Sequence, residues 1–246
     1  MSLAVKRALY RHGWDTRSRN LLPVHLLRPI LGRAIDQCQN LLLDVGCGGF
    51  GLASFLPDVS VVGVDLETPS ETVSNLKFRV GSVTSLPFPD RSFLVVSCID
   101  VLEHLPEAER ERAVRELVRV ASETILIACP HGVIARRCDN EYRRASLKHG
   151  RPVPEWVEEH LRQTYPEHTA VAESVQRAAR ATGRSAKVTL SFCEPANVSR
   201  LIRSAAVRSE LLYFCANLLL GIISPLLPSP AADKSYRMVL LAELSS

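Results

Sequence analysis

The chain has 246 residues, of which 46% are hydrophobic and 23% charged, and its formal net charge at pH 7 is +4. This composition excludes a disordered chain, and the length is enough for one α/β domain with a large core. The net charge is too small to identify a partner by itself.

The first 40 residues contain seven of the basic side chains but only two acidic ones. We interpret residues 1–40 as a basic helical arm, which either contacts an anionic partner or forms an ordinary solvated helix. Within the arm, apolar residues at helical spacing predict a helix over 21–37, with Pro29 as a candidate break.

A glycine-rich turn follows the first predicted strand. Residues 41–51 read LLLDVGCGGFG, and a second apolar run ends at Asp65. The pattern predicts a strand, a tight turn, a short helix and a second strand, with the acids Asp44 and Asp65 at the strand ends. Such acids face the crevice where open α/β sheets bind ligands, and an acid two residues before the first glycine suits a cationic ligand.

Further apolar runs predict strands near 77–80, 93–98 and 123–129, and the segment 107–121 has the pattern of an amphipathic helix. Apolar runs separated by helices indicate a parallel sheet covered on both faces. Strands are also expected near 186–192 and 236–243. We therefore expect one domain over 41–246 with two insertions, a helical cap at 131–185 and an apolar helical segment at 195–232.

The segment 211–232 carries no charge and approaches the length of a membrane span, but three prolines interrupt it. We expect a packed helix or hairpin over a substrate pocket or at a homodimer interface, with a peripheral membrane contact as the alternative. The seven cysteines form no CxxC pair, and no clean apolar stretch follows Lys6 and Arg7. We therefore expect a cytoplasmic protein with reduced thiols and no signal peptide.

Two segments together, DVGCG at 44–48 and LPFPDRSFLVVSCIDVLEHLP at 86–106, resemble class I S-adenosylmethionine-dependent methyltransferases. The resemblance covers roughly residues 38–132. It implies an α/β fold of the Rossmann type, with a doubly wound, mostly parallel seven-stranded sheet and helices on both faces. It also implies S-adenosyl-L-methionine as cofactor and S-adenosyl-L-homocysteine as product.

The resemblance further implies roles for individual residues. Asp44 would contact the amino end of the cofactor through water, and Asp65 would bind both ribose hydroxyls. The backbone of the turn would pass the methionine part, Leu66 would contact the adenine, and residues after the third strand would flank its rim. The cofactor-binding residues expected are Asp44, Gly46, Cys47, Gly48, Gly49, Asp65, Leu66, Ser82, Val83, Asp100 and His104.

His131, which follows the fifth strand, is the candidate general base. We expect methyl transfer to an oxygen of a small-molecule, glycan or lipid-linked acceptor, and no nucleic-acid partner. The alternatives are a non-catalytic methyltransferase-like scaffold and an NAD-dependent oxidoreductase, which the glycine pattern also fits. Asp100-x-x-Glu103-His104 resembles a segment of metal-assisted methyltransferases, but we assign no metal, since metal-free relatives carry a similar segment.

Overall fold

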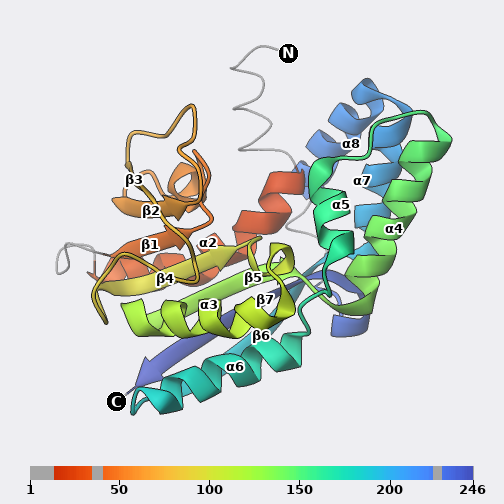
Figure 1. Ribbon diagram of the computed structural model, residues 1–246. Coiled ribbons are helices and arrows are strands. Elements are labelled where there is room, and N and C mark those ends of the chain that lie inside the picture. Colours follow the sequence, from red (N-terminus) through yellow and green to blue (C-terminus); the bar gives the residue numbers. More distant parts are fainter. Residues whose placement is uncertain (1–13, 35–40, 224–228, 246) are drawn as a thin grey trace.

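The computed structural model describes residues 14–34, 41–223 and 229–245. Its centre is a seven-stranded sheet in the order β3-β2-β1-β4-β5-β7-β6 (Figure 1). The strands are β1 (Leu42–Val45), β2 (Val61–Asp65), β3 (Leu76–Val80), β4 (Phe93–Ile99), β5 (Ala121–Pro130), β6 (Ser185–Pro195) and β7 (Ser235–Ser245). The first five are parallel, and β7 is antiparallel to both β5 and β6. The predicted doubly wound α/β fold is confirmed.

Helices cover both faces of the sheet. The helices α3 (Glu107–Val120) and α6 (His168–Ala181) pack on one face, where Val114, Leu117 and Val175 are fully buried. The helix α2 (Trp14–Ala34) and the short helix η1 (Leu52–Phe55) cover the other face. Two apolar layers therefore enclose the central strands, which explains why those strands are almost continuously hydrophobic.

Four further helices group together beside the sheet (Figure 1). They are α4 (Gly132–Lys148), α5 (Glu155–Arg162), α7 (Ala196–Arg208) and α8 (Glu210–Ile223). Helix α4 begins directly after β5, and it packs on α5 and α7, while α8 packs on α7 and α2. We call α4, α5, α7 and α8 the cap. Helix α6 belongs to the sheet face, so the segment expected as one insertion at 131–185 contributes to two parts of the molecule.

Helix α2 differs from the expected helix over 21–37 in where it begins and in having no break at Pro29. Helix α2 begins at Trp14 and continues through Pro23 and Pro29 without ending at either. The buried residues Leu27 and Leu31 hold it on the sheet, and this packing outweighs the missing amide donors. Residues 1–13 and 35–40 of the expected arm and helix lie outside the described residues.

Helix α8 occupies the first part of the uncharged segment and exposes one apolar side, formed by Leu211, Leu212, Leu218, Leu219 and Ile222. Among the described residues, no helix combines the length and the apolar character needed to cross a bilayer. The prolines at 225 and 228 lie outside the described residues. A homodimer or membrane contact for this segment stays a prediction.

Candidate functional site

The glycine turn closes tightly over the end of β1. Gly46, Gly48 and Gly51 all have positive φ, which favours glycine. A side chain at Gly51 would also collide with Asp44, since its Cβ would lie 2.3 Å from the carboxylate oxygen Oδ2. The Gly48 amide donates to Asp65 Oδ2 at 2.8 Å, and the Leu66 amide donates to Oδ1 at 2.7 Å. Asp65 therefore connects the turn to the end of β2.

Asp44 is buried, and both of its oxygens accept hydrogen bonds within the protein. Oδ2 accepts from the Leu52 amide at 2.8 Å, at the start of η1, and Oδ1 accepts from the Ser97 hydroxyl at 2.7 Å. Ser97 lies directly opposite Asp44 in the pairing of β1 with β4. Burial raises the pKa of Asp44 to about 6, although these two hydrogen bonds act in the opposite direction. The carboxyl group therefore organises the turn, and it also lines the adjoining cavity.

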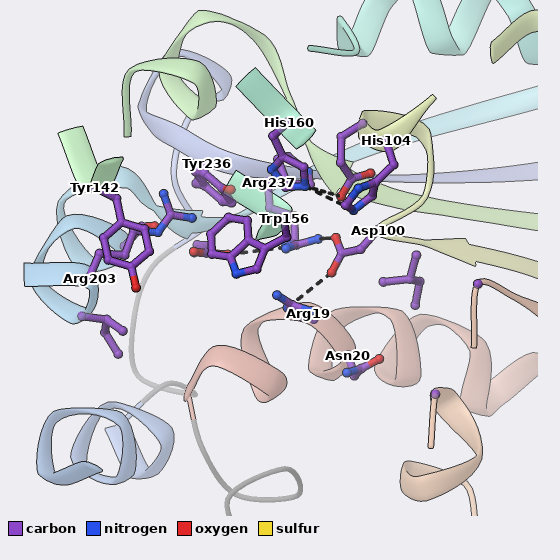
Figure 2. Close-up of a pocket in the computed structure, with 18 of the residues that line it drawn as sticks. Arg19, Asn20, Asp100, His104, Tyr142, Trp156, His160, Arg203, Tyr236 and Arg237 are labelled. Atoms are coloured by element: carbon purple, nitrogen blue, oxygen red, sulfur yellow. Dashed lines mark hydrogen bonds and ion pairs between the residues drawn. The ribbon is translucent and has the colours of Figure 1, made fainter. Parts of the chain in front are cut away.

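A cavity of about 480 Å³ extends from this turn to the cap. Figure 2 shows that its side chains come from parts of the chain that are far apart in sequence. The lining includes Asp44, Gly46, Cys47 and Leu52 near the turn, Asp100, Glu103 and His104 after β4, Arg19 and Asn20 from α2, Tyr142, Trp156, His160 and Arg203 from the cap, and Tyr236 and Arg237 from β7. The cavity thus extends from the turn to a part with aromatic and charged walls formed by the cap and β7, which we call the chamber.

Asp100, which follows β4, lines the cavity and has a left-handed backbone conformation with φ +56°. Its carboxylate pairs with Arg237 and lies 3.3 Å from Arg19 Nε (Figure 2). Burial alone would raise the pKa of Asp100, but the two arginines outweigh it and lower the pKa to about 2. Arg237 is itself buried and also pairs with Glu194 at 3.4 Å. Asp100 is therefore ionised and connects β4 to α2 and β7.

A second buried carboxylate connects the cap to the sheet. Asp139 on α4 accepts hydrogen bonds from Arg203 at 2.6 Å, His160 Nδ1 at 3.0 Å, the Tyr236 hydroxyl at 3.0 Å and the Tyr165 hydroxyl. Burial raises the pKa of Asp139, but these donors more than compensate, and the net effect lowers it. Four elements thus share one ionised group.

The structure brings only part of the predicted site together around the cavity. Asp44, Gly46, Cys47, Asp100 and His104 line it. The other predicted cofactor residues do not, and they follow the adjoining strand ends: Gly48, Gly49, Asp65, Leu66, Ser82 and Val83. Their roles toward a cofactor stay predictions.

His131 lies at the start of α4 and does not line the cavity. It is only 4% exposed, and its ring packs against those of His168 and Phe192, each at a centroid distance of 5.3 Å. Burial, followed by the charges of His168 and Arg237, lowers the pKa of His131 to about 4. Its role as general base stays a prediction that this packing does not favour.

Sequence reasoning did not identify several residues that line the cavity away from the glycine turn. They are Arg19, His160, Arg203, Tyr236 and Arg237. One signal was available, because the Glu-His pair at 103–104 occurs again at 159–160. The two pairs meet in space, and His104 Nδ1 lies 2.9 Å from Glu159 Oε2. The arginines carry no comparable signal, since nothing near them in sequence indicates burial.

The sequence around this site was compared with known protein families. Residues 43–127, which include the turn and β4, match the family model described as a methyltransferase domain. Residues 43–127 therefore carry the sequence of a methyltransferase domain. This domain carries the glycine turn, the acids at the ends of β1 and β2, and the Asp100–His104 segment.

Curated relatives match part of the chain. An uncharacterized methyltransferase of Schizosaccharomyces pombe is 30% identical over 117 residues, which are 39% of this chain and 41% of the relative. A ubiquinone biosynthesis O-methyltransferase of Paracidovorax citrulli is 34% identical over 122 residues, which are 43% of this chain and 51% of the relative. The chain thus spans about half the length, or less, of these curated relatives.

A solved structure supports the fold over a longer range. A protein of Galdieria sulphuraria, described as a sarcosine dimethylglycine methyltransferase, superposes with a TM-score of 0.53 at 16% identity. The match covers 93% of this chain and 87% of that chain. At this identity the similarity shows the fold alone, so the cap and its cavity have to be interpreted from their own residues.

Proposed function

We propose that the protein is an S-adenosylmethionine-dependent methyltransferase that methylates an oxygen of an acceptor bound in the cavity. The observation that carries this proposal is the continuity of the cavity, which extends from the glycine turn of a methyltransferase domain to the chamber under the cap. A methyl donor at the turn and an acceptor in the chamber would therefore meet near Asp100.

The chemistry needs little beyond placement. The bond from the methyl carbon to sulfur breaks as the bond to the acceptor oxygen forms, and the acceptor hydroxyl loses its proton. Because the sulfonium is already a good leaving group, most of the acceleration comes from holding the two reactants in line and away from water. Buried walls from the cap and β7 support such an arrangement.

The residues of the chamber support an acceptor that combines a flat apolar part with a hydroxyl group. Tyr142, Trp156 and Tyr236 supply aromatic surface, and His104 and His160 supply polar groups. Oxygen as the methylated atom is supported by the relatives named for ubiquinone biosynthesis O-methylation. A small molecule, a glycan or a lipid-linked precursor would fit this description.

Cofactor binding is tested by calorimetric titration of the full chain with S-adenosyl-L-homocysteine. The wild-type chain is expected to bind one molecule. Asp65→Ala removes the carboxylate that the ribose would use, and the affinity should fall by about tenfold or more. Asp58→Asn, an exposed acid in the same region, is the matched control and should bind like the wild type. Absence of binding by the folded chain, or equal affinity in Asp65→Ala, would contradict the proposal.

Acceptor class is tested with tritiated S-adenosylmethionine and fractionated cell extract. Label in a small-molecule, glycan or lipid fraction supports the proposed acceptor, and label in RNA or protein contradicts it. Cofactor binding without label in any fraction would favour a non-catalytic scaffold. NAD binding in place of S-adenosylhomocysteine would favour the oxidoreductase.

A further inference from the structure

Two histidines from distant parts of the chain direct the same ring nitrogen toward each other. His104 belongs to η2 (Leu102–His104), after β4, and His160 lies on α5. Their Nε2 atoms are 3.3 Å apart at the wall of the cavity (Figure 2). The partner of Nδ1 in each ring determines whether this contact is an ordinary hydrogen bond.

The other nitrogen of each ring contacts a carboxylate. His160 Nδ1 lies 3.0 Å from Asp139, and His104 Nδ1 lies 2.9 Å from Glu159. An ionised carboxylate can only accept, so each Nδ1 carries a hydrogen, and a neutral ring then has a lone pair on Nε2. Rings held in this way can direct two lone pairs at one point, which a cation would stabilise.

Glu103 supplies a third group at the same point. It is only 1% exposed, its carboxyl lies beside that of Asp100, and neither of its oxygens accepts a hydrogen bond from an N–H or hydroxyl donor among the described residues. Its Oε1 lies 3.9 Å from His160 Nε2. The possible ligand atoms of Glu103, His104 and His160 all lie within 4.8 Å of one another. A buried carboxylate without a partner is costly unless a cation or a proton neutralises it.

We propose that Glu103, His104 and His160 bind one divalent transition-metal ion at the wall of the cavity. The spacing fits, because two nitrogens bound at about 2.0–2.1 Å to a tetrahedral ion lie about 3.3 Å apart. Two imidazoles and one carboxylate suit ions such as Zn²⁺, Co²⁺ or Fe²⁺ better than Mg²⁺ or Ca²⁺. Asp139 and Glu159 then act as positioning residues that fix the tautomer and orientation of each ring.

The site also has a consequence for the acceptor. All three proposed ligands line the cavity, so an ion held by them would be within reach of an acceptor bound in the cavity. An acceptor hydroxyl bound there would have a lowered pKa and would need no separate protein base. This consequence rests on the proposed function, whereas the metal site itself does not.

The test is a titration of the tag-free, metal-stripped full chain with Co²⁺ alone, followed by its visible absorption. The absorption of Co²⁺ intensifies when the ion leaves octahedral water for a site with fewer ligands. The wild-type chain should bind one Co²⁺, which Zn²⁺ should displace. His104→Asn and His160→Asn should each weaken binding by more than about tenfold. The asparagine amide can replace Nδ1 as donor to the carboxylate but has no group at Nε2.

His149→Asn is the matched control, because this exposed histidine caps the end of α4, does not line the cavity and hydrogen-bonds to the Ala145 carbonyl through Nδ1. It should bind Co²⁺ like the wild type. If either histidine variant fails to fold, as judged by its melting temperature, Glu103→Gln gives a second test with almost unchanged shape, and it should also weaken binding by about tenfold.

The proposal is overturned if the folded wild-type chain binds no Co²⁺, or if the two histidine variants keep its affinity. The histidines would then share a proton instead of a metal ion. S-adenosyl-L-homocysteine binding, measured on the same samples, separates the two proposals. Co²⁺ binding without the nucleoside would leave the metal site standing and contradict the proposed function, and the reverse would contradict the site.

Discussion

Single residues in this protein differ in how far their sequence neighbourhood determines their role. Asp44 and Asp65 follow short apolar runs, and strand ends of a parallel sheet converge, so their position at the turn could be predicted. Arg237 could not, because its partner Asp100 is 137 residues away and β7 brings the two together. His160 is similar: only the fold turns its Nε2 toward His104.

Asp44 gives a prediction at this scale. Its pKa is about 6 in the folded chain against an ordinary 3.8, so the folded state binds this proton more tightly. The carboxyl therefore favours folding below pH 3.8, and that contribution is lost as the pH rises through about 6. Asp44→Asn stays neutral, so its unfolding free energy relative to the wild type should rise by about 2 kcal/mol between pH 4 and 7.

Urea unfolding of Asp44→Asn and of the wild type at several pH values in this range measures the difference. Ser97 can reorient its hydroxyl to accept from the new amide, so the variant is expected to fold. A difference that does not change with pH would mean that Asp44 is not buried as an acid.

Elements were predicted well where a pattern is local. The five parallel strands begin and end within about two residues of the runs that indicated them, since strands buried on both faces are apolar throughout. The same reasoning could not assign α6 to the sheet face, because an amphipathic helix shows that it has a buried side but not which partner covers it. Helix α2 likewise continues through Pro29 because of packing that lies outside the local pattern.

Helix α3 provides the element-scale prediction. Arg119, in its last turn, donates to the carbonyls of Leu86 and Phe88 and pairs with Asp90 and Glu116. It thereby holds the loop before β4 against the helix. Arg119→Lys loses the planar group that reaches several acceptors at once, and the unfolding free energy should fall by about 1–2 kcal/mol.

The matched control is Arg115→Lys, on the same helix. Arg115 is exposed, and its ion pair among the described residues is with Glu111, at 3.5 Å. Its replacement should change the unfolding free energy by less than about 0.5 kcal/mol. Equal effects of the two substitutions in urea unfolding would show that the contacts to the loop add no stability.

For the whole molecule, the sheet and the cap meet at Asp139. Asp139→Asn would leave the Arg203 guanidinium, which is largely buried, without its charge partner and would place an amide donor among several other donors. Such a loss costs about 3 kcal/mol or more. We expect a lower melting temperature and faster hydrogen exchange in α4 and α5, with less change in β1 and β4.

Glu141→Gln is the control for this prediction, because Glu141 lies on the same helix and forms an exposed pair with Arg200 at 2.7 Å. Its unfolding free energy should stay within about 0.5 kcal/mol of the wild type. Exchange that accelerates uniformly across Asp139→Asn would indicate that the cap does not open separately from the sheet.

The position of β7 has a consequence for how the protein is made. Every acid at the ends of the parallel strands leaves the ribosome before β7, and Arg237 follows Asp100 by 137 residues. At the usual pace of translation, the nascent chain carries that acid for about ten seconds before Arg237, the buried one of its two arginine partners, is synthesised. During this interval the edge of β5 that pairs with β7 in the folded protein has no partner. When β7 is synthesised, it has to insert between β5 and β6, which are both already present.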